Sequence, residues 1–183
     1  MAGTYTHVTL SVAVSGEKED VLTLLADQRA MFKITLRGLT EEQARQRTTV
    51  SELTLGGLLK HLTWGEQATL KDLRERDENA EIDLSELAGN HELLDGETVA
   101  HYLAEYDRVA AELEAYVAET SLDDLIPQPT APWQPEREWW TVRKMLLHRL
   151  RETAHHSGHA DIIRESLDGQ TTMAALFEET PSS

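Results

Sequence analysis

Four stretches of the chain repeat apolar residues at helical spacing, and together they predict an all-α protein. An α-helix turns once every 3.6 residues, so apolar side chains three or four positions apart fall on one face. Such stripes cover residues 17–37, 52–76, 96–120 and 139–169. Four long amphipathic helices with one long crossover connection predict a four-helix bundle.

The segments between and beside these helices carry weaker patterns. Residues 1–16 predict a loosely held arm with at most one short strand, and residues 77–95 are too acidic to be expected to pack. Four of the five prolines lie in residues 127–135, which excludes a helix or a central strand there and predicts an ordered loop. The polar tail, residues 170–183, is expected to fray.

Composition narrows the class of protein. A chain of 183 residues predicts a single domain, 1–183, with a real hydrophobic core. The 33 acidic and 17 basic residues give a net charge of −16, which argues against nucleic acid and anionic membranes as partners. The sequence has no signal-peptide pattern and no apolar run near the ~20 residues that span a bilayer, so we expect a cytoplasmic protein. Cysteine is absent, so any thiol chemistry needs a thiol from outside the chain.

A polar stripe on the last predicted helix is the strongest chemical signal. At 100° per residue, His148, Glu152, His155, His156 and His159 fall within an arc of about 100°, on the side where this helix is expected to bury hydrocarbon. Buried polar groups cost free energy unless they are paired or bind a metal. The stripe therefore favours a metal site. Glu152/His156 and His155/His159 are each one turn apart, and spacing alone does not choose between these pairs.

A third ligand has to come from another helix, and His61 is the sole histidine on the second one, which is expected to begin after the N-cap residue Ser51. Gly57 and Gly65 flank His61, although a helix-interior glycine costs about 1 kcal/mol relative to alanine. They predict either a geometric role at the site or close helix packing. Three protein ligands with an open fourth position are typical of catalytic zinc sites, and nitrogen and oxygen ligands also suit nickel, manganese or iron.

Other interpretations of the histidines remain open at this stage. The run can be a solvated face or a hydrogen-bonded cluster without metal. Glu-x-x-His occurs once, at Glu152 and His155, whereas a di-iron bundle needs it on two helices. His-Glu-x-x-His is absent, which argues against the common metalloprotease pattern. The remaining histidines are expected to be ordinary surface or connector residues, namely His7, His91 and His101.

Two segments carry a resemblance to a known group of proteins. WTVRKMLLHRLRETAHHSGHADIIRESLDG on the last helix and LTLGGLLKHLTWGE on the second resemble the DinB / YfiT-like superfamily of four-helix-bundle metalloproteins. They are most similar to its actinobacterial branch, which includes mycothiol-dependent enzymes. Members bind a divalent metal, usually zinc or nickel, through a histidine on helix two and two residues one turn apart on the last helix.

The resemblance also selects ligands. Aligning the glycine of the family's His-x-Gly segment with Gly158 places the last two ligands at Glu152 and His156, the Glu-x-x-x-His pattern of the maleylpyruvate isomerase type. It therefore implies the triad His61, Glu152 and His156. His155 and His159 become neighbours of the ligands, expected in the second shell, and His148 falls outside the first shell.

The resemblance implies a divalent-metal enzyme that activates a low-molecular-weight thiol for S-transfer or isomerisation. Zinc is the expected metal, with nickel as the alternative, and mycothiol or a similar thiol is the expected cosubstrate beside an electrophile. Dimers are common among such relatives, so a homodimer is compatible with it. A non-catalytic, stress-related metal-binding bundle and a metal-dependent hydrolase remain the alternatives. The long crossover is expected at residues 133–140, and this segment and residues 77–95 are expected to close over the helix ends.

Overall fold

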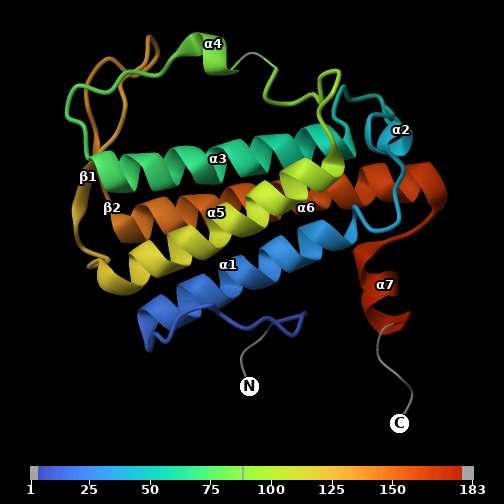
Figure 1. Ribbon diagram of the computed structural model, residues 1–183, viewed down its shortest axis with the longest axis horizontal. Coiled ribbons are helices and arrows are strands. Elements are labelled where there is room, and N and C mark those ends of the chain that lie inside the picture. Colours follow the sequence, from blue (N-terminus) through green and yellow to red (C-terminus); the bar gives the residue numbers. More distant parts are fainter. Residues whose placement is uncertain (1–3, 88, 179–183) are drawn as a thin grey trace.

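The computed structural model describes residues 4–87 and 89–178, and it confirms an all-α four-helix bundle (Figure 1). The bundle helices are α1 (Glu17–Ile34), α3 (Leu55–Glu75), α5 (Val99–Glu119) and α6 (Val142–Asp168). Three short helices accompany them, α2 (Glu41–Ala44), α4 (Leu84–Leu87) and α7 (Thr172–Glu178). The strands β1 (Leu125–Pro127) and β2 (Trp139–Thr141) form a two-stranded antiparallel sheet. None of the described helices is long and apolar enough to cross a membrane.

The direction of the helices shows which connection is the crossover. Helices α1 and α6 run one way and α3 and α5 the other, so that α3 and α5 begin at the same end of the bundle (Figure 1). The ion pair between Lys60 Nζ and Glu97, 2.8 Å, ties those two beginnings together. Residues 76–98 must therefore travel back along the whole bundle. The crossover predicted at residues 133–140 is wrong, because that segment only joins neighbouring helix ends.

Two helix starts differ from the prediction. Helix α3 begins after Thr54, whose hydroxyl accepts a hydrogen bond from Gly57 N at 3.1 Å, rather than after Ser51. Helix α6 begins after Thr141, because the two preceding tryptophans lie in β2 and pair with β1. Aromatic residues favour strands, and this pairing satisfies the backbone before the helix starts. Pro127 ends β1 in a sheet that has only edge strands, as its missing N–H requires.

The N-terminal arm is bound firmly to the bundle, contrary to the prediction. Thr6 N donates to Asp27 Oδ1 at 2.7 Å, and Ser11 N donates to Glu114 Oε2 at 3.1 Å. Three apolar side chains of the arm pack against the core, Leu10, Val12 and Val14. Within residues 4–16 the backbone forms no strand, and residues 1–3 of the predicted arm lie outside the described part of the chain.

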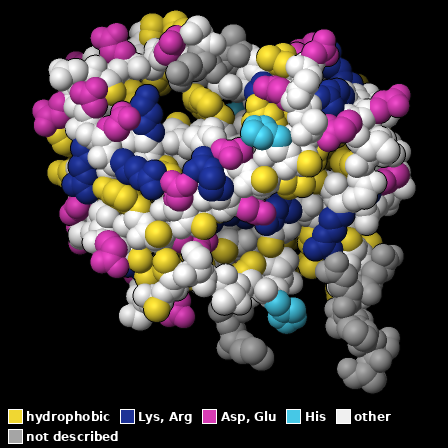
Figure 2. Space-filling model, viewed as in Figure 1, with side chains coloured by type: hydrophobic (Ala, Val, Ile, Leu, Met, Phe, Trp, Pro, Cys, Tyr) yellow, Lys and Arg dark blue, Asp and Glu magenta, His cyan; other side chains and the backbone are white. Residues whose placement is uncertain are grey.

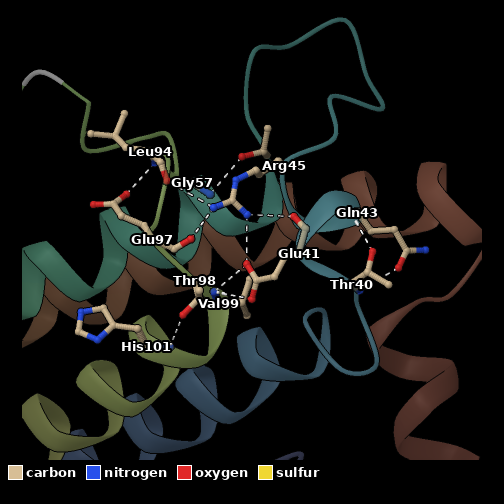
Figure 3. A network of polar contacts seen from close by, with 11 residues as sticks. Thr40, Glu41, Gln43, Arg45, Gly57, Leu94, Glu97, Thr98, Val99 and His101 are labelled. Carbon is tan, nitrogen blue, oxygen red and sulfur yellow. Dashed lines mark hydrogen bonds and ion pairs between the residues drawn. The ribbon is translucent and has the colours of Figure 1, made fainter.

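The acidic connector also packs, because one of its apolar residues lies in the core. Leu93 is 5% exposed and belongs to the core. Figure 3 shows how the end of this segment is held: Arg45 donates to the carbonyl oxygens of Leu94 and Glu97, and the Glu41 carboxylate accepts from Val99 N at 3.0 Å. The prediction that charge prevents packing is wrong here, since Leu93 is buried and Arg45 holds the backbone of Leu94 and Glu97.

Part of the predicted frayed tail is helical. Helix α7 packs beside α1, with Ala175 buried, and Thr172 N donates to Asp161 Oδ1 at 2.6 Å. Residues 179–183 of the tail lie outside the described part of the chain.

The bundle interior contains two apolar clusters with an ionic cluster at their border. On α1, Leu25 belongs to one apolar cluster and Phe32 to the other, and the buried Arg29 lies between them. Arg29 Nε and Nη2 donate to the two oxygens of Glu66 at 2.7 and 2.9 Å, and Arg29 Nη1 donates to Glu114 at 3.3 Å. Burial lowers the pKa of Arg29, but Glu66 outweighs it and the pKa is raised.

Candidate metal centre

Three side chains from two packed helices converge at the predicted site. His61 comes from α3, and Glu152 and His156 come from α6. One ligand atom from each residue lies within 4.8 Å of the other two. The His61 and His156 rings are 4.8 Å apart at 76°, and His156 Nε2 lies 3.8 Å from Glu152 Oε2. Within residues 4–87 and 89–178, no other group of three such residues comes together in this way.

The stripe lies at the border of the packed face of α6 rather than at its centre. The side chains of Glu152 and His156 are 25% and 12% exposed, and His155 is exposed. The residues that α6 buries most deeply around this height are small or apolar, namely Thr153, Ser157, Ala160 and Ile163. The expectation that the stripe points into the core is therefore wrong. Its half-buried position keeps the triad within reach of a ligand.

The protonation states of the triad suit a cation. Burial lowers the pKa of His61 to about 4, assisted by the nearby His91 and His156. Burial likewise lowers the pKa of His156 to about 4, against the opposing effect of Glu152. Burial opposes ionisation of Glu152, but its hydrogen bond from Arg151 and nearby positive charge outweigh this and lower its pKa. At neutral pH the triad offers two imidazole lone pairs and one carboxylate, the forms that bind metals.

Unsatisfied polar atoms at the site indicate a missing partner. His61 Nδ1 is buried and has no hydrogen-bond partner among the described residues. A buried polar atom without a partner costs about 1–3 kcal/mol. Glu152 Oε1 accepts from Arg151 Nη2 at 2.8 Å, which leaves Oε2 facing His156. The residues present therefore fit a divalent cation with two nitrogen ligands and one oxygen ligand.

The glycines around His61 make room for the connector and for an arginine. A Cβ on Gly57 would lie 2.0 Å from the carbonyl oxygen of His91, and one on Gly65 would lie 2.2 Å from Arg149 Nη1. His91 is exposed as expected, but its ring stacks on His61 at 4.2 Å and 22°. Both glycines thus have a geometric role at the site, and neither is used for close packing of two helix backbones.

The other histidines of the stripe lie around the triad. His148 Nδ1 is 2.8 Å from Arg151 Nη2 and 4.0 Å from Glu152 Oε1, and its ring contacts Trp140 at 5.4 Å, so it lies beside Glu152 without belonging to the triad. His159 Nδ1 lies 3.5 Å from His156 Nδ1, and the His155 ring lies 4.4 Å from the His159 ring. His159 is therefore the stripe residue that contacts a triad histidine through its ring nitrogens. The two distant histidines, His7 and His101, are exposed as predicted.

A cavity of about 800 Å³ lies one helical turn from the triad, between α3 and α6. Its walls include three of the four tryptophans, Trp64, Trp133 and Trp140. The connector residues 81–83 and 90 and the loop residues 128–140 contribute further walls, so both predicted segments do cover this space. Figure 2 shows the opening beneath the connector. Cavities of several hundred Å³ with apolar walls are typical small-molecule sites.

Two residues of this cavity carry signals that the sequence interpretation missed. Arg149 lies three residues before Glu152 and seven before His156, so helical spacing alone places it on the same stripe. Asp72 lies on the wall formed by α3, and burial raises its pKa to about 6. No sequence pattern marks Asp72, because its burial depends on the crossover and the loop that cover α3.

Comparison with known proteins identifies the family. The model of the mycothiol-S-transferase family matches residues 20–169, which include the triad, all of α3, α5 and α6, and all but the first three residues of α1. The chain belongs to the mycothiol-S-transferase family. This confirms the resemblance to mycothiol-linked bundle proteins.

A solved structure supports the fold of this family member independently. This chain is similar to the crystal structure of a conserved protein from Enterococcus faecalis, with a TM-score of 0.61 and 17% identity over 86% of this chain and 100% of that chain. At this identity the likeness shows the fold alone. Comparison with curated proteins gives no match.

Proposed function

We propose that this family member is a divalent-metal-dependent enzyme that transfers the sulfur of mycothiol, or of a similar small thiol, to an electrophilic substrate. The observation that carries the proposal is the triad, in which two neutral histidines and an ionised glutamate converge beside a buried unpartnered nitrogen. Family membership supports the choice of thiol. The absence of cysteine is consistent with a thiol supplied from outside.

The residues of the site divide the work between holding a metal and holding a substrate. His61, Glu152 and His156 would hold the metal, zinc by preference and nickel as the alternative. A bound divalent metal would lower the pKa of an incoming thiol and favour the thiolate. Arg151 and His91 orient the ligands, the first through its hydrogen bond to Glu152 and the second by stacking on His61. The tryptophan walls exclude water from the electrophile.

The proposed reaction joins the thiol sulfur to an electrophilic carbon. The thiol proton is released, the sulfur forms the new bond, and a leaving group departs with its bonding electrons. In isomerisation the thiolate instead adds to a conjugated double bond and no other group leaves. After rotation about the bond that has become single, the double bond forms again and the thiolate departs. A metal held by His61, Glu152 and His156 alone would keep room for the thiol, as catalytic rather than structural zinc sites do.

The test combines metal content with turnover. Wild-type protein is compared with His61→Ala, Glu152→Ala and His156→Ala, with the exposed His101→Ala as the matched control. We expect near-stoichiometric metal and transfer of mycothiol to chlorodinitrobenzene in wild type and control, and the loss of both in the three triad variants. Turnover of a nitrophenyl ester without thiol would instead indicate a hydrolase. Bound metal without either activity would indicate a non-catalytic metal-binding protein.

A further inference from the structure

Arg149 is a half-buried arginine whose side chain makes no hydrogen bond or ion pair with the described residues. It lies on α6, one turn from Glu152, and it lines the cavity. Its Nε is buried and has no hydrogen-bond partner among the described residues, and no described carboxylate lies within ion-pair distance of its side chain. Burial lowers the pKa of Arg149. A planar guanidinium held in this way retains its capacity to bind a carboxylate with two parallel hydrogen bonds.

The neighbouring ionic cluster does not use this capacity. Both oxygens of Glu66 accept from Arg29, so Glu66 acts on Arg149 only as a nearby charge. Gly65 provides the space for the guanidinium, since any side chain there would collide with Nη1. A helix-interior glycine costs stability, and the position that this one creates is occupied by a donor that faces no protein acceptor. The arrangement is that of a binding group prepared for a ligand.

The rest of the cavity indicates the shape and charge of that ligand. Trp64 and Trp140 offer flat aromatic surfaces, and Trp133 adds a third from the loop. Three carboxylates of the wall are exposed, Glu81, Asp83 and Glu138, and Glu138 accepts from Trp140 Nε1 at 2.5 Å while Asp83 accepts from Ser85. The fourth, Asp72, is half-buried, and burial raises its pKa to about 6. An anion that enters a protein of net charge −16 needs a local positive group, and the half-buried Arg149 supplies it.

We propose that Arg149 binds the anionic group of the substrate, and that the electrophile is a flat, aromatic or conjugated carboxylate. That the ligand reacts as an electrophile rests on the proposed function, whereas the anion site itself is inferred from the cavity alone. The tryptophan walls hold the flat body, Arg149 binds the carboxylate, and the triad lies one turn further along α6. Arg149 is thus a specificity residue, because it selects among electrophiles by their charge.

The experiment measures binding without turnover. The cavity contains three of the four tryptophans, so quenching of tryptophan fluorescence by 4-nitrobenzoate and by the neutral, similarly shaped 4-nitrobenzamide reports on their binding. We expect wild-type protein to bind the carboxylate at least about tenfold more tightly than the amide, the size of one charge-assisted hydrogen bond. Arg149→Gln should abolish this preference. Lys71→Gln, which removes one exposed positive charge from the same cavity, should retain it.

Two further arms keep the outcome unambiguous. The preference for the carboxylate should persist after chelator treatment. If the carboxylate bound to the metal rather than to Arg149, removal of the metal would abolish the preference. If Arg149→Gln does not fold, Gly65→Ala provides the test instead. The new Cβ moves the guanidinium out of its position but keeps the positive charge on the protein, and alanine stabilises the helix relative to glycine. Equal binding of the two probes by wild type overturns the proposal, as does a preference that survives both Arg149→Gln and Gly65→Ala.

The result is independent of the thiol chemistry. Selective binding of nitrobenzoate without mycothiol transfer would reject the proposed function and keep the anion site. Transfer to electrophiles with no preference between the two probes would reject the anion site and keep the proposed function.

Discussion

Two polar clusters lie inside the same bundle, and they differ in how fully their hydrogen-bonding groups are satisfied. In the cluster of Arg29, Glu66 and Glu114, every side chain is at least nine-tenths buried and each is hydrogen-bonded by another group of the protein. In the triad, His61 and His156 are only half-buried, and His61 Nδ1 has no partner among the described residues.

This difference separates structural polarity from functional polarity. A closed cluster offers nothing to a ligand, since each nitrogen of the Arg29 guanidinium already donates to a carboxylate of the protein. The triad and Arg149 together present acceptors and donors that the protein itself leaves unused, next to a cavity. Natural interiors satisfy nearly all their buried polar groups, so a concentration of unsatisfied ones marks a place where a ligand completes the structure.

Removing one member of the closed cluster should have the largest effect on stability. Arg29→Met leaves Glu66 and Glu114 buried without their counter-charge, and loss of one partner of a buried pair costs about 3–5 kcal/mol. Urea unfolding should show this loss in the free energy of unfolding. The triple variant Arg29→Met, Glu66→Leu, Glu114→Leu should recover most of it, because apolar residues of similar volume replace buried ion pairs at little cost.

The control for this experiment lies one turn away on the same helix. Lys33 pairs with Asp107 at 2.7 Å, but both side chains are largely solvated, at 34% and 60% exposure. Lys33→Met should change the free energy of unfolding by less than about 1 kcal/mol. A loss from Arg29→Met as small as that from Lys33→Met would contradict the contrast between a closed cluster and a solvated pair.

Metal addition should stabilise the protein through the triad of His61, Glu152 and His156 alone. A ligand that binds only the folded state at 100 times its dissociation constant contributes about 2.7 kcal/mol, or roughly 5–10 °C in Tm for a chain of this size. Chelator-treated wild type should gain this increase when zinc is added. His61→Ala should not, although without metal its Tm should lie close to that of wild type, because the variant also removes an unsatisfied buried atom.

His155→Ala distinguishes the two ligand pairs that helical spacing permits. His155 lies on the same stripe but is exposed and outside the triad. Its variant should therefore keep the full zinc-dependent increase in Tm. An increase lost in His155→Ala and kept in Glu152→Ala would shift the site to the His155/His159 pair.

The bundle was predicted from local periodicity, and the convergence of His61, Glu152 and His156 was predicted from the stripe together with the resemblance. Helical spacing alone revealed the stripe on α6, and the resemblance to known bundle proteins chose Glu152 and His156 within it. The direction of α5 could not be predicted, because periodicity carries no information on whether a connection crosses the bundle. The packing of the connector could not be predicted either, because it depends on a long-range contact. Leu93 is buried against α3, where only a glycine at position 56 leaves space for its side chain.

The buried cluster and the cavity were missed for a different physical reason. Arg29, Glu66 and Glu114 lie on three helices, far apart in the sequence, so only the packed fold shows that they pair. Trp139 was assigned to a helix because its neighbours continue a helical pattern, yet strand pairing determines its conformation. In both cases long-range contacts override the local signal.

The smallest expected effect is on the pH dependence of stability at Asp72. The test compares this carboxyl, which lines the cavity, with an exposed one. Burial raises the pKa of Asp72 to about 6 from an ordinary 3.8; Glu75 adds to this, and Lys71 and Arg149 oppose it. The folded state therefore holds a proton that the unfolded state releases, and stability is lost as the pH rises from about 4 to about 6.

Asp72→Asn removes this loss. Its free energy of unfolding at neutral pH should exceed that of wild type by about 1 kcal/mol after allowance for solvent screening, and the difference should vanish near pH 4. Glu78→Gln, at an exposed position after α3, should follow wild type at every pH in the same chemical unfolding series. A constant gain across the whole pH range would show that Asp72 is destabilising by shape rather than by charge.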